Sequence, residues 1–322
     1  MDDRSIDSHP DLMNPDWQKH AEKEAWAEVR KTQRRKRGFW RRPSLWVVLG
    51  LIVLVGAAVV VRQVKGQTTN DPAAAPPPPT VAPSTLPRTA KVDLTQPFLN
   101  TPAAQWKEGL DGLEVPTAEK LGALTAEQVA SAYDQVKKVI NATVLDRTAV
   151  EKHDHSGLYE MLGAESAKSV KEVLEGPDKT KVSSYVTEIA DGFHLLPANP
   201  RLKGKLSAQA GERKGEILVK ANYVVAYAFD TADPGKLSGP GDIVAFRREE
   251  SGYAVYTPKA GGGVFFDGGQ SQTFSMACGA AKAGYLAPAY SEVNVGNGPG
   301  VSDEARIYDI DKPIDNSGPG CG

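Results

Sequence analysis

Apolar and polar residues divide this chain into regions of distinct character, and the sharpest change comes near the N-terminus. Residues 44–61 carry no charge and are uniformly apolar from Leu45 to Val61. A run of this length is enough to cross a hydrocarbon core about 30 Å thick. A helix in a soluble core is rarely apolar on every side for so long. Because 43 residues precede the run, it predicts an uncleaved transmembrane helix rather than a cleavable signal.

The charges on the two sides of the apolar run predict its orientation. Eight Lys and Arg residues and no acid lie between Arg30 and Arg42, whereas only Arg62 and Lys65 follow the run closely. Positive flanks stay in the cytoplasm. Residues 1–43 are therefore expected to form a cytoplasmic basic stub on anionic membrane lipid, with the rest extracytoplasmic. The basic side chains expected at the membrane interface are Arg34, Arg35, Lys36, Arg37, Arg41 and Arg42.

A proline-rich stretch follows the apolar run, and the globular pattern starts only after it. Seven prolines lie between Asp71 and Pro87. Proline-rich chain favours an extended, semi-rigid conformation without a core of its own. Residues 62–100 are thus predicted to be an extracytoplasmic linker. Residues 101–290 are predicted to be a folded domain, and residues 291–322 a Gly- and Asp-rich C-terminal extension.

Helical periodicity dominates the first part of the predicted domain. Leu124–Val144 repeats apolar residues at helical spacing, and Thr125 with Gln128 has the spacing of a capping box. A second helix is expected within Gly157–Glu175, because Gly176-Pro177 would end it.

The pattern then changes to the two-residue alternation of strands. Gly215–Asp230 alternates, with Val219, Tyr223 and Tyr227 among the residues that would share one face. Residues 242–258 predict two strands around a turn near Glu250-Ser251-Gly252, and Val264–Phe266 and Gln272–Met276 predict further strand segments. Helices followed by antiparallel strands predict an α+β fold.

The order of these elements carries a resemblance. Residues 120–258 resemble the nuclear-transport-factor-like superfamily in the order of their elements. These are two helices, the long strand "GEILVKANYVVAYAFD" and the segment "IVAFRREESGYAVYT". The resemblance implies a curved antiparallel sheet that surrounds helices and forms a pocket. Membrane-anchored members with short cytoplasmic stubs occur in actinobacterial envelopes. The superfamily includes enzymes and non-catalytic binding proteins, so the resemblance does not decide between these activities.

The side chains that could act in such a pocket are few. His194 with Asp191 is a candidate acid–base pair, and Tyr223 and Tyr227 are candidate pocket-lining residues. The run His153-Asp154-His155 has metal-binding side chains, but we interpret it as a solvated loop without a further ligand. No catalytic motif, metal or cofactor is therefore predicted. Residues 63–322 hold 26 basic and 32 acidic residues, which disfavours nucleic acid as a partner.

The chain has two cysteines, Cys278 and Cys321. The predicted topology places both in an oxidising compartment, where a pair of cysteines predicts a disulfide. An intramolecular bridge would close the C-terminal extension against the domain. A bond from one or both thiols to another chain is the alternative.

These observations lead to one functional expectation and two alternatives. The expectation is a single-pass cell-envelope membrane protein whose non-catalytic extracytoplasmic domain binds a protein partner or takes part in an assembly. The first alternative is an enzyme that acts on a small or lipid-like molecule in the pocket, with His194 beside a carboxylate. The second is a transmembrane sensor that signals through the stub.

Overall fold

A computed structural model describes residues 82–83, 85–87, 89–292 and 304–314 of the chain. The predicted transmembrane helix at residues 44–61 and the basic stub lie outside these residues. In the described part, no helix is both long and apolar enough to cross a membrane.

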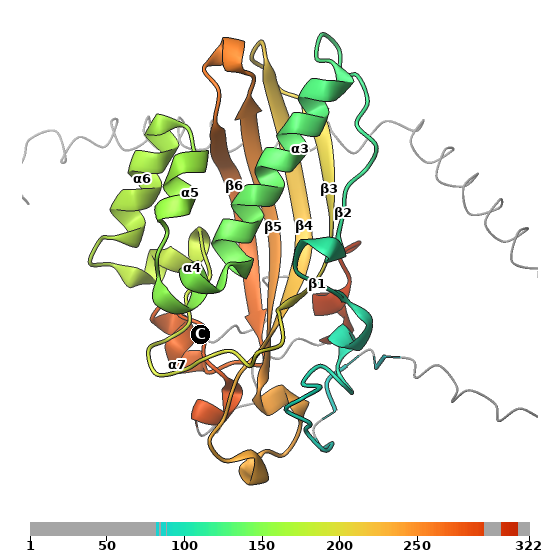
Figure 1. Ribbon diagram of the computed structural model, residues 1–322, viewed down its shortest axis with the longest axis vertical. Helices are drawn as coiled ribbons and strands as arrows, with labels where there is room; N and C mark the ends of the chain where they lie inside the picture. Colours follow the sequence, from blue (N-terminus) through green and yellow to red (C-terminus); the bar gives the residue numbers. More distant parts are fainter. Residues whose placement is uncertain (1–81, 84, 88, 293–303, 315–322) are drawn as a thin grey trace, which may run out of the picture. The chain divides into compact units, whose positions relative to one another are not determined.

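The described residues have an α+β fold in which helices pack on a largely antiparallel sheet (Figure 1). The strands are β1 (Lys107–Glu108), β2 (Leu113–Glu114), β3 (Arg201–Ala210), β4 (Glu216–Ala228), β5 (Val244–Tyr256) and β6 (Val264–Phe274). The α-helices are α3 (Ala126–Ile140), α4 (Arg147–Lys152), α5 (Ser156–Met161), α6 (Ala164–Leu174) and α7 (Cys278–Lys282). The strand order is β1-β3-β4-β5-β6, and the short β2 pairs with β3 in parallel.

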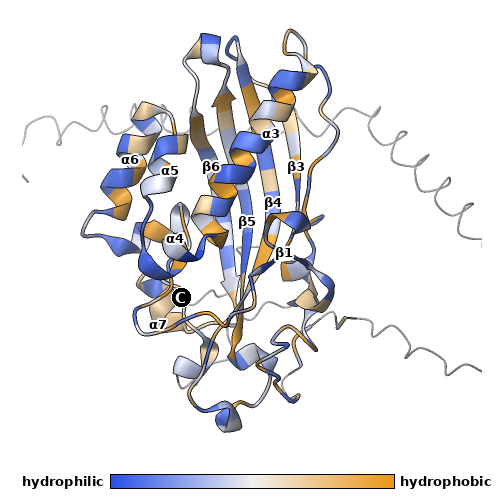
Figure 2. Cartoon of the chain, in the orientation of Figure 1, coloured by the Kyte–Doolittle hydropathy of each residue, from blue (hydrophilic) through white to orange (hydrophobic). Residues whose placement is uncertain are grey.

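Helix α3 begins and packs as its sequence predicts. Thr125 accepts a hydrogen bond from the Gln128 amide, and the Gln128 side chain accepts one from the Thr125 amide, so the capping box is formed. The apolar face that includes Val136 and Ile140 is buried against the sheet, and Figure 2 shows apolar and polar faces alternating along this helix. At Asn141–Leu145 the chain widens into a π-helical turn before α4.

The predicted second helix is two helices. Between α5 and α6 the chain extends at Leu162, which forms a parallel bridge with Val264, and the Gly163 amide donates to the Val264 carbonyl at 2.9 Å. A β-carbon at Gly163 would lie 2.1 Å from the tip of the Phe265 ring, so any larger residue would displace that ring. The contact with β6 therefore interrupts a segment that is helical in its periodicity.

The predicted turn at Glu250-Ser251-Gly252 is wrong, because β5 is one continuous strand through these residues. Gly252 instead lies where β6 bulges, and a β-carbon there would meet the Asp267 carbonyl oxygen at 3.0 Å. The reversal into β6 comes later, through the three positive-φ residues Gly261, Gly262 and Gly263. The two strand segments predicted between Val264 and Met276 are likewise joined into the single strand β6.

The two faces of the sheet are covered by different parts of the chain. The inner face packs against helices α3–α6 and includes the predicted row Val219, Tyr223, Val225 and Tyr227. On the outer face, Val224 and Ala226 belong to a second apolar cluster. Its further members include Phe98, Phe246, Ile307, Tyr308 and Ile310. The packed body therefore contains Phe98, from the range predicted as linker, and part of the predicted C-terminal extension.

We call residues 304–314 the C-terminal strap, because they bind across the outer face of three strands. Asn222 on β4 donates to the Ile310 carbonyl at 2.7 Å, and Arg248 on β5 donates to the Lys312 carbonyl at 3.2 Å. Lys203 on β3 donates to the Tyr308 carbonyl at 3.4 Å. The strap is thus held through its own main chain as well as through its buried apolar side chains.

Candidate functional site: an acidic aromatic groove

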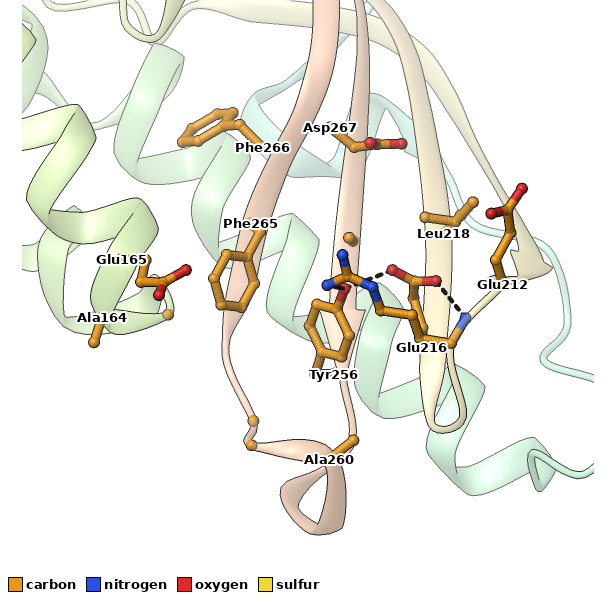
Figure 3. A pocket seen from close by; sticks show the side chains of 15 residues that line it. Ala164, Glu165, Glu212, Glu216, Leu218, Tyr256, Ala260, Phe265, Phe266 and Asp267 are labelled. Atoms are coloured by element: carbon orange, nitrogen blue, oxygen red, sulfur yellow. Dashed lines mark hydrogen bonds between the residues drawn. The ribbon is translucent and has the colours of Figure 1, made fainter.

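A groove of about 770 Å³ opens where the ends of β4, β5 and β6 lie beside the start of α6 (Figure 3). It is the largest of the cavities that we compare in the described part of the chain. We refer to it below as the acidic groove.

The floor of the acidic groove is fixed by a hydrogen-bonded cluster that the strand register creates. Glu216 and Tyr256 are cross-strand partners of β4 and β5, although 40 positions separate them. The Tyr256 hydroxyl donates to Glu216 Oε1 at 2.6 Å, and the Arg213 amide donates to Oε2 at 3.0 Å. The bond from Tyr256 lowers the pKa of Glu216, and the same bond raises the pKa of Tyr256. Glu216 is therefore held as a carboxylate whose oxygens are both occupied.

Two aromatic rings form the apolar part of the floor. The Tyr256 and Phe265 rings meet edge to face, with their centroids 5.3 Å apart. Figure 3 shows them side by side on neighbouring strands. Phe265 occupies the space that the missing side chain of Gly163 leaves. The two perpendicular rings offer an aromatic face and an aromatic edge against which an aliphatic or cationic group can lie.

Three exposed carboxylates surround these rings: Glu165 on α6, Glu212 before β4 and Asp267 on β6. In the ranges that the structure describes, none of the three forms an ion pair. The guanidinium group of Arg213 donates to the Tyr256 hydroxyl at 3.1 Å. The acidic groove thus has negative charge around an aromatic floor, an arrangement that favours cations.

The structure does not place His194 and Asp191, the predicted acid–base pair, together in a cavity. The His194 side chain is 73% exposed, and its Nδ1 lies 3.5 Å from Glu151 Oε2. Asp191 is exposed in the preceding turn. His194 is thus a mostly exposed histidine beside the carboxylate of Glu151, and the enzyme alternative stays a hypothesis.

Tyr223 and Tyr227 lie in the buried core on the inner face of the sheet. The Tyr227 hydroxyl donates to the Val144 carbonyl at 2.8 Å, which anchors β4 to the turn after α3. Burial raises the pKa of both tyrosines well above the ordinary value. Both are therefore neutral residues of the packed interior.

The sequence analysis missed a buried ion pair beside these tyrosines. Arg247 and Glu249 alternate on the inner face of β5, and Arg247 Nε donates to Glu249 Oε2 at 2.8 Å. Burial alone would lower the pKa of Arg247, but the carboxylate of Glu249 and the neighbouring groups raise it. The two-residue spacing of "RREES" was the available signal, because alternate residues of a strand share one face.

The interpretation of His153-Asp154-His155 as a solvated loop is wrong for His155, which is 5% exposed. Its Nε2 lies 2.8 Å from Oε1 of the buried Glu188. Within the described segments, no group of three or more His, Cys, Asp or Glu side chains is arranged to hold a metal ion.

Several predicted residues fall outside the described part of the chain. These are Arg34, Arg35, Lys36, Arg37, Arg41, Arg42 and Cys321. Cys278 begins α7. The disulfide between Cys278 and Cys321 therefore stays a prediction.

No family model, curated protein or solved structure matches this chain.

Proposed function

We propose that this chain is a single-pass cell-envelope membrane protein whose extracytoplasmic domain docks a basic segment of a protein partner in the acidic groove. The domain acts by binding and not by catalysis. We also propose that the domain belongs to the nuclear-transport-factor-like superfamily and has its curved sheet. The basic stub is proposed to contact anionic lipid. The anchor is supported by the apolar run at residues 44–61 and by the basic residues that precede it.

The observation that carries the docking proposal is the charge and shape of the acidic groove. Glu165, Glu212 and Asp267 stand around two aromatic rings, and among the described residues none of the three forms an ion pair. A Lys or Arg side chain on the rings would gain both a cation–π contact and a charge-assisted hydrogen bond. Because the floor is built on paired strands, little ordering is needed when the partner binds.

The polar groups of the acidic groove support binding over catalysis. Glu216, its most buried carboxylate, accepts from Tyr256 and from the Arg213 amide, and these bonds lower its pKa, which makes it a weaker base. No histidine lines the acidic groove. A partner would therefore meet fixed charges and rings rather than a group ready to exchange a proton.

Charge reversal in the acidic groove tests the docking proposal. The variant Glu212→Lys/Asp267→Lys should bind a fluorescent decapeptide of alternating Lys and Ser at least about tenfold more weakly than the wild-type chain, because attraction becomes repulsion. Fluorescence anisotropy of the full chain in detergent measures the affinity. The matched control is Asp134→Lys/Glu172→Lys, which reverses two exposed charges on α3 and α6 away from the groove. Equal weakening in both variants would contradict a specific site.

The proposed topology is tested separately. Protease added to intact spheroplasts should remove the domain and leave a membrane-embedded fragment that contains residues 1–61. This result is expected because the basic side of the apolar run stays in the cytoplasm. An antibody against the N-terminal stub identifies the fragment on a gel. A domain that becomes sensitive only after the membrane is lysed would overturn the orientation.

A further inference from the structure

A second cavity, of about 540 Å³, lies at the corner between α4 and α5 and is distinct from the acidic groove. His153, His155 and Glu188 line it, together with Tyr159 and Tyr285. We call it the histidine cavity. Helix α4 ends at His153 in the left-handed conformation, and Asp154 accepts from the Ser156 amide at 3.0 Å as α5 begins. This tight corner directs both histidines toward the segment that contains Glu188.

The hydrogen-bond partner of His153 determines which of its ring nitrogens carries the proton. His153 Nε2 lies 2.8 Å from the Ile189 carbonyl oxygen, which can only accept, so Nε2 is the donor. The other nitrogen, Nδ1, is then an acceptor in the neutral ring. It faces Glu188 Oε2 at 3.9 Å. When the ring is neutral, these two atoms are both acceptors, so a donor between them can bond to each.

His155 lies deeper in the fold than His153, and one of its ring nitrogens also has no hydrogen-bond donor beside it. Its Nε2 bonds to Glu188 Oε1, and its buried Nδ1 has no hydrogen-bond partner among the described residues. Both the His155 and the Glu188 side chains are 3% exposed. Since buried polar atoms in proteins are almost always paired, this nitrogen marks a polar corner beside the cavity that the described residues leave unsatisfied.

The cations that line the histidine cavity are already engaged. Lys171 pairs with Glu175 at 3.7 Å and lies over the Tyr159 ring, while Lys179 donates to the Leu174 carbonyl. Burial, followed by the charges of Glu175, Glu188 and Asp154, raises the pKa of Tyr159 to about 12. The cavity is therefore an acidic environment whose lysines are occupied.

We infer that the histidine cavity binds a small molecule through a primary ammonium group, which donates hydrogen bonds to His153 Nδ1 and Glu188 Oε2. An ammonium group supplies three donors and no acceptor, so it satisfies both atoms and balances the buried carboxylate. The Tyr285 ring stacks on His153 at 5.8 Å and walls the same space. His155 is a positioning residue, because it holds the other oxygen of Glu188.

The five histidines of the chain make a direct test possible. The full chain, labelled with ¹³C in its histidine rings, is titrated in detergent with n-propylammonium chloride. The ring signals of His153 and His155 should shift and saturate, while the signal of the exposed His194 stays unchanged. Tetramethylammonium chloride carries the same charge without an N–H donor, so it should produce no saturable shift. Equal responses to both cations, or no response to n-propylammonium, would overturn the inference.

Variants separate the site from general damage. His153→Phe keeps the ring against Tyr285 but removes the acceptor, and it should weaken n-propylammonium binding about tenfold or more. Glu188→Gln removes the charge at nearly constant shape and should do the same. His194→Phe is the control and should bind as the wild-type chain does. Unchanged affinity in His153→Phe, or a saturable shift with Zn²⁺ and none with the amine, would contradict an ammonium site. These outcomes do not depend on the acidic groove.

Discussion

Val219→Asp is expected to destabilise the domain strongly, with a loss of about 4 kcal/mol or more in the free energy of unfolding. Val219 is fully buried on the inner face of β4, between Ala208 of β3 and Tyr253 of β5. A carboxylate there would have no cross-strand cation. Domains of this size are stable by only about 5–15 kcal/mol, so the loss is a large part of the total. Urea unfolding followed by circular dichroism measures it.

The control is the next residue, Leu218, which is half-buried on the outer face and lines the acidic groove. Leu218→Asp should cost about 1 kcal/mol, because the new charge stays in water. Val225 would be a poorer test position than Val219, since Arg247 is its cross-strand partner and could pair with the new carboxylate. Similar losses in Val219→Asp and Leu218→Asp would contradict the two-sided description of β4.

Tyr308→Ala in the C-terminal strap should lower the free energy of unfolding by about 3 kcal/mol or more. The Tyr308 ring is 6% exposed and meets the Phe246 ring edge to face, with the centroids 4.9 Å apart. It also contacts the Trp106 and Phe274 rings. Removing it opens a cavity in the outer apolar cluster. The same urea experiment measures this change.

Tyr290→Ala is the matched control, because Tyr290 is 36% exposed, packs against Phe193 and donates one exposed hydrogen bond to the Asp230 carbonyl. Its loss should be clearly smaller than that of Tyr308→Ala. If the two variants lose the same stability, the strap does not contribute to the folded body.

The sequence predicted those elements whose signals are local. The capping box at Thr125 and the apolar face of α3 depend on neighbouring turns of one helix, and both were found. The alternation along β4 correctly grouped Val219, Tyr223 and Tyr227 on one face. It gave no sign of what covers Val224 and Ala226, because the strap that buries them lies about 80 residues further along the chain. The consecutive apolar residues from Tyr223 to Phe229 were the available hint of burial on both faces.

The errors arise where a distant contact overrides a local preference. Glu250-Ser251-Gly252 has the composition of a turn, yet pairing with β6 keeps it within strand β5, opposite the β6 bulge. Strand β3 was not predicted, although Leu202 and Leu206 alternate correctly, because Gly204 and Ala208 weaken the pattern.

Both candidate sites illustrate the same limit. The chain separates Tyr256 from Glu216 by 40 positions and His155 from Glu188 by 33 positions. Only the folded structure brings each pair together. His194 was conspicuous in the sequence as a lone histidine, but a lone side chain carries no information about its exposure.

The C-terminal strap also constrains when this domain can finish folding. Its contacts with Asn222 and Arg248 join residues 88 and 64 positions apart. At synthesis rates of about 5–20 residues per second, the strap follows Arg248 by roughly 3–13 s. During that interval Val224, Ala226 and Phe246 remain open to water beside a formed sheet, where another chain can cover them instead. Nascent chains stalled before residue 304 should consequently bind chaperones more strongly than chains stalled well after residue 314.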